Sequence, residues 1–143
     1  MDPREFQVLA SELVGRNRAA DIRSAISRAY YAVFNVGAEI LAELGFRVSK
    51  GANAHGEVRH RLSNSGDLDV SKVGSQLGDL QSRRIQADYR VKQKDIENQK
   101  VAQAFVELAN KMIQILDQCR SEPRRLQIIK AIQEWEIKTG QRS

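Results

Sequence analysis

The sequence is poor in the residues that build covalent or metal-based frameworks. In 143 residues it has one cysteine, Cys119, and two histidines. A single cysteine excludes an intrachain disulfide, and no Cys/His grouping has the spacing of a zinc site. We therefore expect no bound metal and a reducing, cytoplasmic setting.

Long apolar runs and nucleotide-cofactor motifs are missing as well. The most apolar stretch is interrupted by Asn35, Glu39 and Glu43, and the amino terminus reads MDPREF. These features predict neither a membrane span nor a signal peptide. No Walker loop, dinucleotide glycine motif or nucleophile elbow is present, so kinase, acyl-transfer and metalloenzyme roles are disfavoured and no cofactor is expected.

What remains is the composition of one globular domain. Hydrophobic residues make up 41% of the chain and charged residues 29%, with two prolines and nine glycines. A chain of this size buries a sufficient core without disulfides or metal. The formal net charge of +5 favours polyanionic partners, although charge alone does not separate nucleic acid from an acidic protein.

Apolar residues recur at helical spacing almost throughout, which predicts an all-α chain of six helices. The expected helices are 2–15, 20–44 with Gly45 as its C-terminal cap, a short one after His55, 70–89 with Asp69 as N-cap, 95–119, and one opened by Pro123. In the fifth helix, one apolar stripe is expected to contain Val101, Phe105, Leu108, Met112, Ile115 and Cys119. The sixth carries a short apolar line of Ile128, Ile132 and Trp135, which we expect to fold onto the bundle.

The second expected helix is apolar on two sides. One face comprises Ile22, Ile26, Ala29, Val33, Val36, Ile40 and Leu44. A second comprises Ser27, Tyr31, Phe34, Ala38 and Leu41. Burial inside a single bundle explains this pattern, and so does a dimer interface. A third line, with Arg28, Tyr31 and Asn35, is polar without Lys or Glu, which is more typical of an interface than of a solvated face.

The fourth expected helix places a charge on an apolar face. Helical steps lead from Leu77 and Leu80 to Arg84, and Asp88 follows four residues later, where it can pair with Arg84. One interpretation is an arginine that lies along the apolar surface with its head in water. The other is an arginine directed at a phosphate or at a partner's carboxylate.

Two segments, AISRAYYAVF (25–34) and RRIQADY (83–89), together resemble the HEPN superfamily, and within it the small stand-alone prokaryotic proteins. The resemblance covers roughly residues 5–118. It implies an up-and-down bundle over 1–120 that dimerises, with 121–143 as a C-terminal helical extension. It also implies RNA as the usual target, metal-independent RNA cleavage in active members, and frequent pairing with a nucleotidyltransferase in toxin–antitoxin or defence modules.

The chain departs from that family at one position that matters for catalysis. Active members resemble one another in an Arg followed four to six residues later by a His, and here Asp88 stands at that distance from Arg84. A carboxylate paired with an arginine does not replace an imidazole as the acid or base of metal-free RNA cleavage. His55, at the start of the third helix, is the alternative source of an imidazole, although a lone His at a helix start is more often a surface residue.

The candidate catalytic residues are therefore Arg84, Asp88, Tyr89 and His55. The expected RNA-binding residues are Arg83, Arg84, Arg90, Lys92 and Lys94. The expected dimer-interface residues are Arg28, Tyr31 and Asn35. We expect an RNA- or partner-binding homodimer with weak or absent nuclease activity; the alternatives are an active endoribonuclease and an interaction module whose nucleotidyltransferase partner carries the chemistry.

Overall fold

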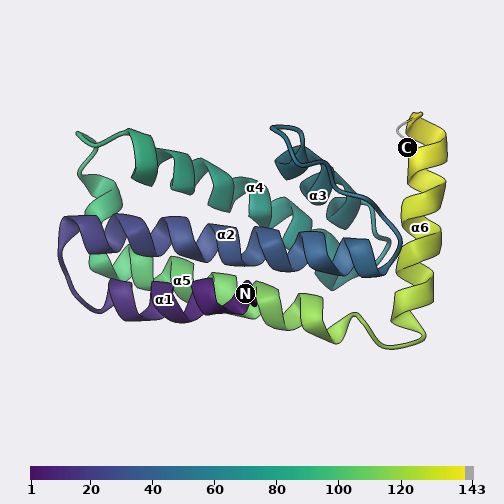
Figure 1. Cartoon of the computed structure of the whole chain (residues 1–143), viewed down its shortest axis with the longest axis horizontal. Coiled ribbons are helices and arrows are strands. Elements are labelled where there is room, and N and C mark those ends of the chain that lie inside the picture. The colour runs from purple at the N-terminus through teal and green to yellow at the C-terminus, as the bar shows by residue number, and fades with distance from the viewer. Residues whose placement is uncertain (141–143) are drawn as a thin grey trace.

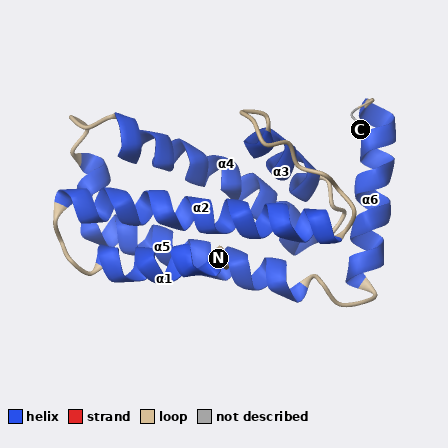
Figure 2. Ribbon diagram, in the orientation of Figure 1, coloured by secondary structure: helices blue, strands red, loops and turns tan. Residues whose placement is uncertain are grey.

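The computed structural model describes residues 1–140, and within them the chain forms helices and loops but no strand (Figure 2). The α-helices are α1 (Arg4–Val14), α2 (Ala19–Glu43), α3 (Ala54–Ser63), α4 (Leu68–Tyr89), α5 (Gln99–Gln118) and α6 (Arg124–Thr139), and a 3₁₀ turn, η1 (Asp95–Glu97), precedes α5. The predicted all-α class is confirmed over these residues. Among them, no helix combines the length and hydrophobicity needed to cross a bilayer.

Helices α1, α2, α4 and α5 form an up-and-down bundle (Figure 1). In it, α1 is antiparallel to α2, α2 to α4, and α4 to α5. The central helix is α2, which packs against α1, α3, α4 and α5. This central position explains why α2 is apolar around much of its circumference.

Both predicted apolar faces of α2 take part in the fold. The first face is buried along its whole length, from Ile22 to Leu44. On the second face Ser27 and Leu41 are buried, whereas Tyr31, Phe34 and Ala38 are partly buried against the core. A single chain therefore covers the first face fully and the second face only in part.

Two helix starts differ from the prediction. The N-cap of α4 is Asp67, not Asp69, and its carboxylate accepts hydrogen bonds of 3.1 Å from the backbone N–H groups of Asp69 and Val70. The extended backbone of Asp67 turns its side chain over the first helical turn, where N–H groups lack partners. The fifth helix begins after η1, where the side chain of Asn98 caps it.

The buried face of α5 is rotated by about one residue from the predicted stripe. Met112 and Cys119 are buried as predicted, whereas Val101 is exposed. The other buried residues of this face are Ala102, Val106, Ala109, Ile113 and Leu116. Phe105, Leu108 and Ile115 lie at the edge of this face. The prediction followed the large side chains, but small alanines face the neighbouring helices and allow close packing.

The last helix, α6, stands across one end of the bundle (Figure 1). Ile128 and Ile132 are buried, as their spacing predicts, and the Trp135 ring lies 6.5 Å from that of His60. Beside them is an ion pair that the sequence analysis did not foresee. Arg61 of α3 donates from Nε to Glu136 of α6 at 2.9 Å, and both side chains are buried.

Candidate functional site

Arg84 is a buried arginine on the face of α4 that meets α2. It is only 8% exposed, and its guanidinium carbon lies 5.7 Å and 5.2 Å from the ring centres of Tyr30 and Tyr31. Its Nη1 is 3.4 Å from a carboxylate oxygen of Asp88, one turn later. The predicted pairing with Asp88 is therefore confirmed. The head of Arg84, however, lies among aromatic rings and not in water.

The hydrogen-bonding capacity of Arg84 is largely unused. Its buried Nε has no hydrogen-bond partner among residues 1–140. Asp88 is its ion-pair partner in this part of the chain, and the carboxylate is 30% exposed and at the limit of hydrogen-bond distance. A buried donor without a partner is unfavourable in the free protein. Arg84 thus has hydrogen-bonding capacity that the described residues do not use.

His55 comes from a different helix and contacts Tyr30 and Tyr31, the two rings that Arg84 also contacts. It occupies the first turn of α3, and its Nδ1 is 2.5 Å from the hydroxyl oxygen of Tyr30. Its ring stacks on Phe34 with the centres 4.4 Å apart. Partial burial and, to a smaller extent, the charge of Arg84 lower the pKa of His55 below its ordinary value. The imidazole is therefore neutral at pH 7.

The hydrogen bond between Tyr30 and His55 decides which imidazole nitrogen carries the proton. Burial raises the pKa of Tyr30, so its hydroxyl stays protonated. Tyr30 is fully buried, and His55 Nδ1 is the acceptor that the described residues offer to its O–H group. The neutral imidazole then carries its proton on Nε2. In this arrangement His55 presents an N–H donor, and its lone pair on Nδ1 is occupied.

The neighbours of Asp88 extend the cluster along α2. Ser27 donates from Oγ to Asp88 at 3.2 Å, and Arg28 Nη2 is 3.5 Å from the same hydroxyl. The Arg28 guanidinium also lies 5.0 Å from the Phe6 ring centre and 5.2 Å from that of Tyr31. Two arginines and a neutral histidine thus lie around the adjacent rings of Tyr30 and Tyr31. We call Ser27, Arg28, Tyr30, Tyr31, His55, Arg84 and Asp88 the arginine–tyrosine cluster.

Several predicted site residues lie outside the arginine–tyrosine cluster. Tyr89 is 72% exposed, and Arg83 and Arg90 are exposed beside it. Lys92 and Lys94 are exposed on the turn that follows α4. Arg23 of α2 holds this turn, because its guanidinium donates to the carbonyls of residues 86, 87, 91 and 93 and pairs with Glu97. The basic run is therefore an exposed surface separate from the buried Arg84.

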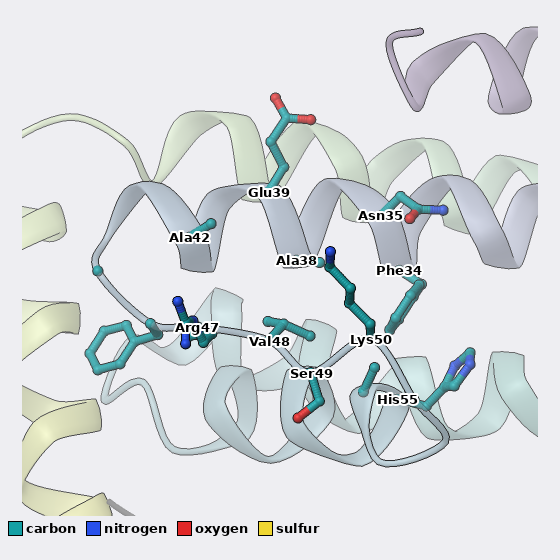
Figure 3. A pocket seen from close by; sticks show the side chains of 14 residues that line it. Phe34, Asn35, Ala38, Glu39, Ala42, Arg47, Val48, Ser49, Lys50 and His55 are labelled. Carbon is teal, nitrogen blue, oxygen red and sulfur yellow. The ribbon is translucent and has the colours of Figure 1, made fainter. Parts of the chain in front are cut away.

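A groove opens on the other side of His55, between α2, the loop 45–51 and the start of α3 (Figure 3). Its volume is about 770 Å³, and it is lined among others by Phe34, Ala38, Val48, Lys50 and His55. Asn35, predicted at a dimer interface, also lines it and donates to the Tyr31 carbonyl at 2.7 Å. Leu44, not Gly45, is the C-cap of α2, and Gly45 follows it with a φ of +96° and turns the chain into this loop.

Two residues of the site, Tyr30 and Phe34, were not predicted to belong to it. Tyr30 was not assigned to any of the lines of α2, and Phe34 was assigned only to an apolar face. The available signal was their spacing of four residues, which places both rings on the side of α2 that His55 approaches. As for metals, residues 1–140 contain no group of three or more His, Cys, Asp and Glu side chains that could hold an ion.

Comparisons with protein families, with curated proteins and with solved structures give no match. The resemblance to the HEPN superfamily therefore stays a prediction that rests on two sequence segments. Those segments do come together in space. Ser27, Tyr30 and Tyr31 from the first contact Arg84 and Asp88 from the second.

Proposed function

We propose that this protein is a HEPN-like RNA-binding protein of a toxin–antitoxin or defence module, and that it cleaves RNA weakly or not at all. One observation carries the proposal. Arg84, although buried, has an unpartnered guanidinium Nε and lies beside the neutral His55 in a cluster formed by the two segments that resemble the family. A guanidinium binds phosphate and carboxylate oxygens, and the net positive charge of the chain favours the phosphates of a polyanion.

The chemistry of the arginine–tyrosine cluster suits an RNA phosphate. Arg84 and Arg28 supply positive charge, and His55 supplies an N–H donor from Nε2. Arginine fits phosphate oxygens with two parallel N–H groups, so one phosphate could satisfy Arg84 where Asp88 does not. The exposed run of Arg83, Arg90, Lys92 and Lys94 would add contacts with neighbouring phosphates.

The same geometry argues against efficient cleavage. Metal-free cleavage needs a base with a free lone pair to activate the 2′-hydroxyl. In the tautomer described above, the Nδ1 lone pair of His55 accepts from Tyr30. Asp88, which pairs with Arg84 through Oδ2, is a carboxylate and does not replace an imidazole as the base. The protein would then hold RNA without the proton transfer that the reaction requires.

An active endoribonuclease is the second candidate, and the neutral His55 beside Arg84 favours it. The imidazole would act as base in its other neutral tautomer. In that form the Nδ1–H group donates to the Tyr30 oxygen, and Nε2 keeps a free lone pair. Arg84 would then stabilise the charge that develops on the phosphate. In this alternative Asp88 and Tyr89 have no role in proton transfer.

One experiment separates the two candidates. The purified protein is incubated with single-stranded and structured RNA in EDTA, and binding and cleavage are followed at increasing salt. We expect binding that weakens steeply with salt and little cleavage. Robust cleavage that His55→Ala or Arg84→Ala abolishes would replace the binding proposal with the nuclease, and absence of RNA binding would refute both.

The proposed assembly is a homodimer, with a nucleotidyltransferase as a further partner of the module. Support comes from the half-buried line of Arg28, Tyr31 and Asn35 on α2. Because Tyr31 also contacts Arg84, Asn35→Arg is a cleaner test of the interface than a change at Tyr31. Light scattering should show a dimer for the native chain and a monomer for Asn35→Arg, and a monomeric native chain would refute the homodimer.

A further inference from the structure

The groove beside His55 has a wall that the fold holds in place. The carbonyl of Arg47 accepts from Arg61 Nη1 at 2.6 Å, and Phe46 is buried. Ser49 donates from its backbone N and from Oγ to the Glu57 carboxylate, at 2.8 Å and 2.6 Å. The loop 45–51 is thus fixed to α3 at several points. A ligand would not have to order it, which favours binding.

The lining of the groove suits a flat, partly aromatic ligand. Phe34 and His55 stack on each other, and Ala38 and Val48 continue the apolar surface. Lys50 reaches from the loop toward α2 across the groove (Figure 3). Planar bases bind to such surfaces by stacking on aromatic side chains next to cations. The volume of about 770 Å³ is ample for one nucleotide.

The charges around the groove give the ligand a direction. His55 lines the groove and contacts Tyr30, whose ring lies 5.7 Å from the guanidinium carbon of Arg84, so a phosphate at Arg84 would lie at this end. The other end, further along α2, is lined by charges of both signs, Glu39 and Arg47, so it lacks the excess positive charge of the Arg84 end. We propose that the groove binds the unpaired base of an RNA nucleotide whose phosphate lies against Arg84 and His55.

This inference rests on the proposed RNA binding and adds a preference to it. A base inside a duplex is stacked and paired on both sides, so it cannot enter a groove without leaving the helix. Single-stranded RNA should therefore bind more tightly than duplex RNA of equal charge. The preference would come from the groove, whereas the salt dependence would come from the arginines.

The test uses adenosine 5′-monophosphate, uridine 5′-monophosphate and ribose 5-phosphate as probes, with binding measured by calorimetry. The two nucleotides should bind about tenfold or more tightly than ribose 5-phosphate, because only they carry a base. Ala38→Trp fills the groove and should abolish this difference while leaving ribose 5-phosphate binding unchanged. Ala104→Trp makes the same change at an exposed site of α5 and should behave like the native chain.

The outcomes separate the groove from the phosphate site. Equal binding of nucleotides and ribose 5-phosphate by the native chain would overturn the inference, while salt-sensitive RNA binding would leave the proposed function standing. An unchanged nucleotide preference in folded Ala38→Trp would overturn it too. If circular dichroism shows that Ala38→Trp is unfolded, Ala42→Trp fills the groove from an exposed position and decides the question. Loss of all RNA binding in the native chain would refute the proposed function itself.

Discussion

The chain buries two arginines near aromatic rings, and their guanidinium groups differ in how many hydrogen-bond partners they have. Arg61 on α3 is 5% exposed and Arg84 on α4 is 8% exposed. Arg61 donates to a buried carboxylate of Glu136 at 2.9 Å and to the Arg47 carbonyl at 2.6 Å. Arg84 has a single carboxylate contact at 3.4 Å and an Nε without a partner in the described part of the chain.

The difference separates an arginine that holds the fold together from one that is open to a ligand. Arg61 joins α3 to the loop 45–51 and to α6, so its two partners lie on two different segments. Arg84 joins only the residues around its own helix and α2. A buried charge is tolerated when its partners are complete, as they nearly are for Arg61. For Arg84 the missing partner is the reason to propose an anionic ligand.

The largest expected effect is on the free energy of unfolding when Arg61 loses its carboxylate partner. Glu136→Ala leaves the Arg61 charge buried without its carboxylate, and it should lower the free energy of unfolding by about 3–5 kcal/mol. Urea denaturation measures the change. Glu134→Ala, on the same helix but exposed, is the control and should have little effect. A loss as small as that of the control would mean that α6 is not held by this ion pair.

The second prediction compares the same substitution at Arg84 and at Arg61. Arg84→Gln should weaken RNA binding about 10- to 100-fold, as expected for lost hydrogen bonds to a charged group. Its free energy of unfolding should change by less than about 1 kcal/mol, because the removed charge had few partners. Arg61→Gln strands Glu136 and should mainly lower the free energy of unfolding. Because Arg61 also holds the loop 45–51, its effect on the phosphate site is measured with ribose 5-phosphate, whose affinity should be unchanged.

Arg83→Gln is the matched control for binding, because Arg83 is the exposed neighbour of Arg84 in sequence. It should weaken RNA binding only slightly. If Arg84→Gln destabilised the fold as much as Arg61→Gln and left RNA binding intact, Arg84 would be a structural residue and the proposed phosphate site would be refuted.

The sequence predicted the helices well because their apolar spacing is local information. It also placed Arg84 and Asp88 together, since residues four apart meet on any helix. The face of α5 was misplaced because alanines carry little weight in an apolar pattern, although Ala102 and Ala109 are fully buried.

The contacts that distinguish the two arginines are different in kind, because they join distant segments. Arg61 and Glu136 are 75 residues apart, and Tyr30 and His55 are 25 apart across the loop 45–51. No periodicity encodes such pairs. The exposure of Tyr89 was also beyond the sequence, since residues 88 and 89 lie on adjacent sides of α4 and only the packing decides which side is covered.

A smaller effect sharpens the account of Arg84. Asp88→Asn removes the carboxylate that competes with phosphate for this arginine, so RNA affinity should rise about two- to fivefold, the scale of a partly exposed ion pair. Fluorescence anisotropy with labelled RNA measures it. A fall in affinity would mean that Asp88 instead orients Arg84 for binding.

Asp88→His, which restores the Arg-to-His spacing of active HEPN nucleases, should raise cleavage from its low level.

The smallest expected effect is a pH dependence of the free energy of unfolding and of RNA affinity. It arises at His55, in the same cluster as Arg84. Burial and the nearby Arg84 lower the pKa of His55 in the folded chain, whereas the unfolded chain titrates near 6.5. Between the lowered pKa and 6.5 the unfolded state binds more protons, so the free energy of unfolding should decrease as the pH falls through this window. His55→Gln should reduce that decrease, and His60→Gln, at an exposed position, should not.

A bound phosphate favours the protonated imidazole, so RNA affinity should rise over the same window in the native chain and not in His55→Gln. Affinity that is independent of pH there would place the phosphate away from His55, and Arg84 alone would then carry the site.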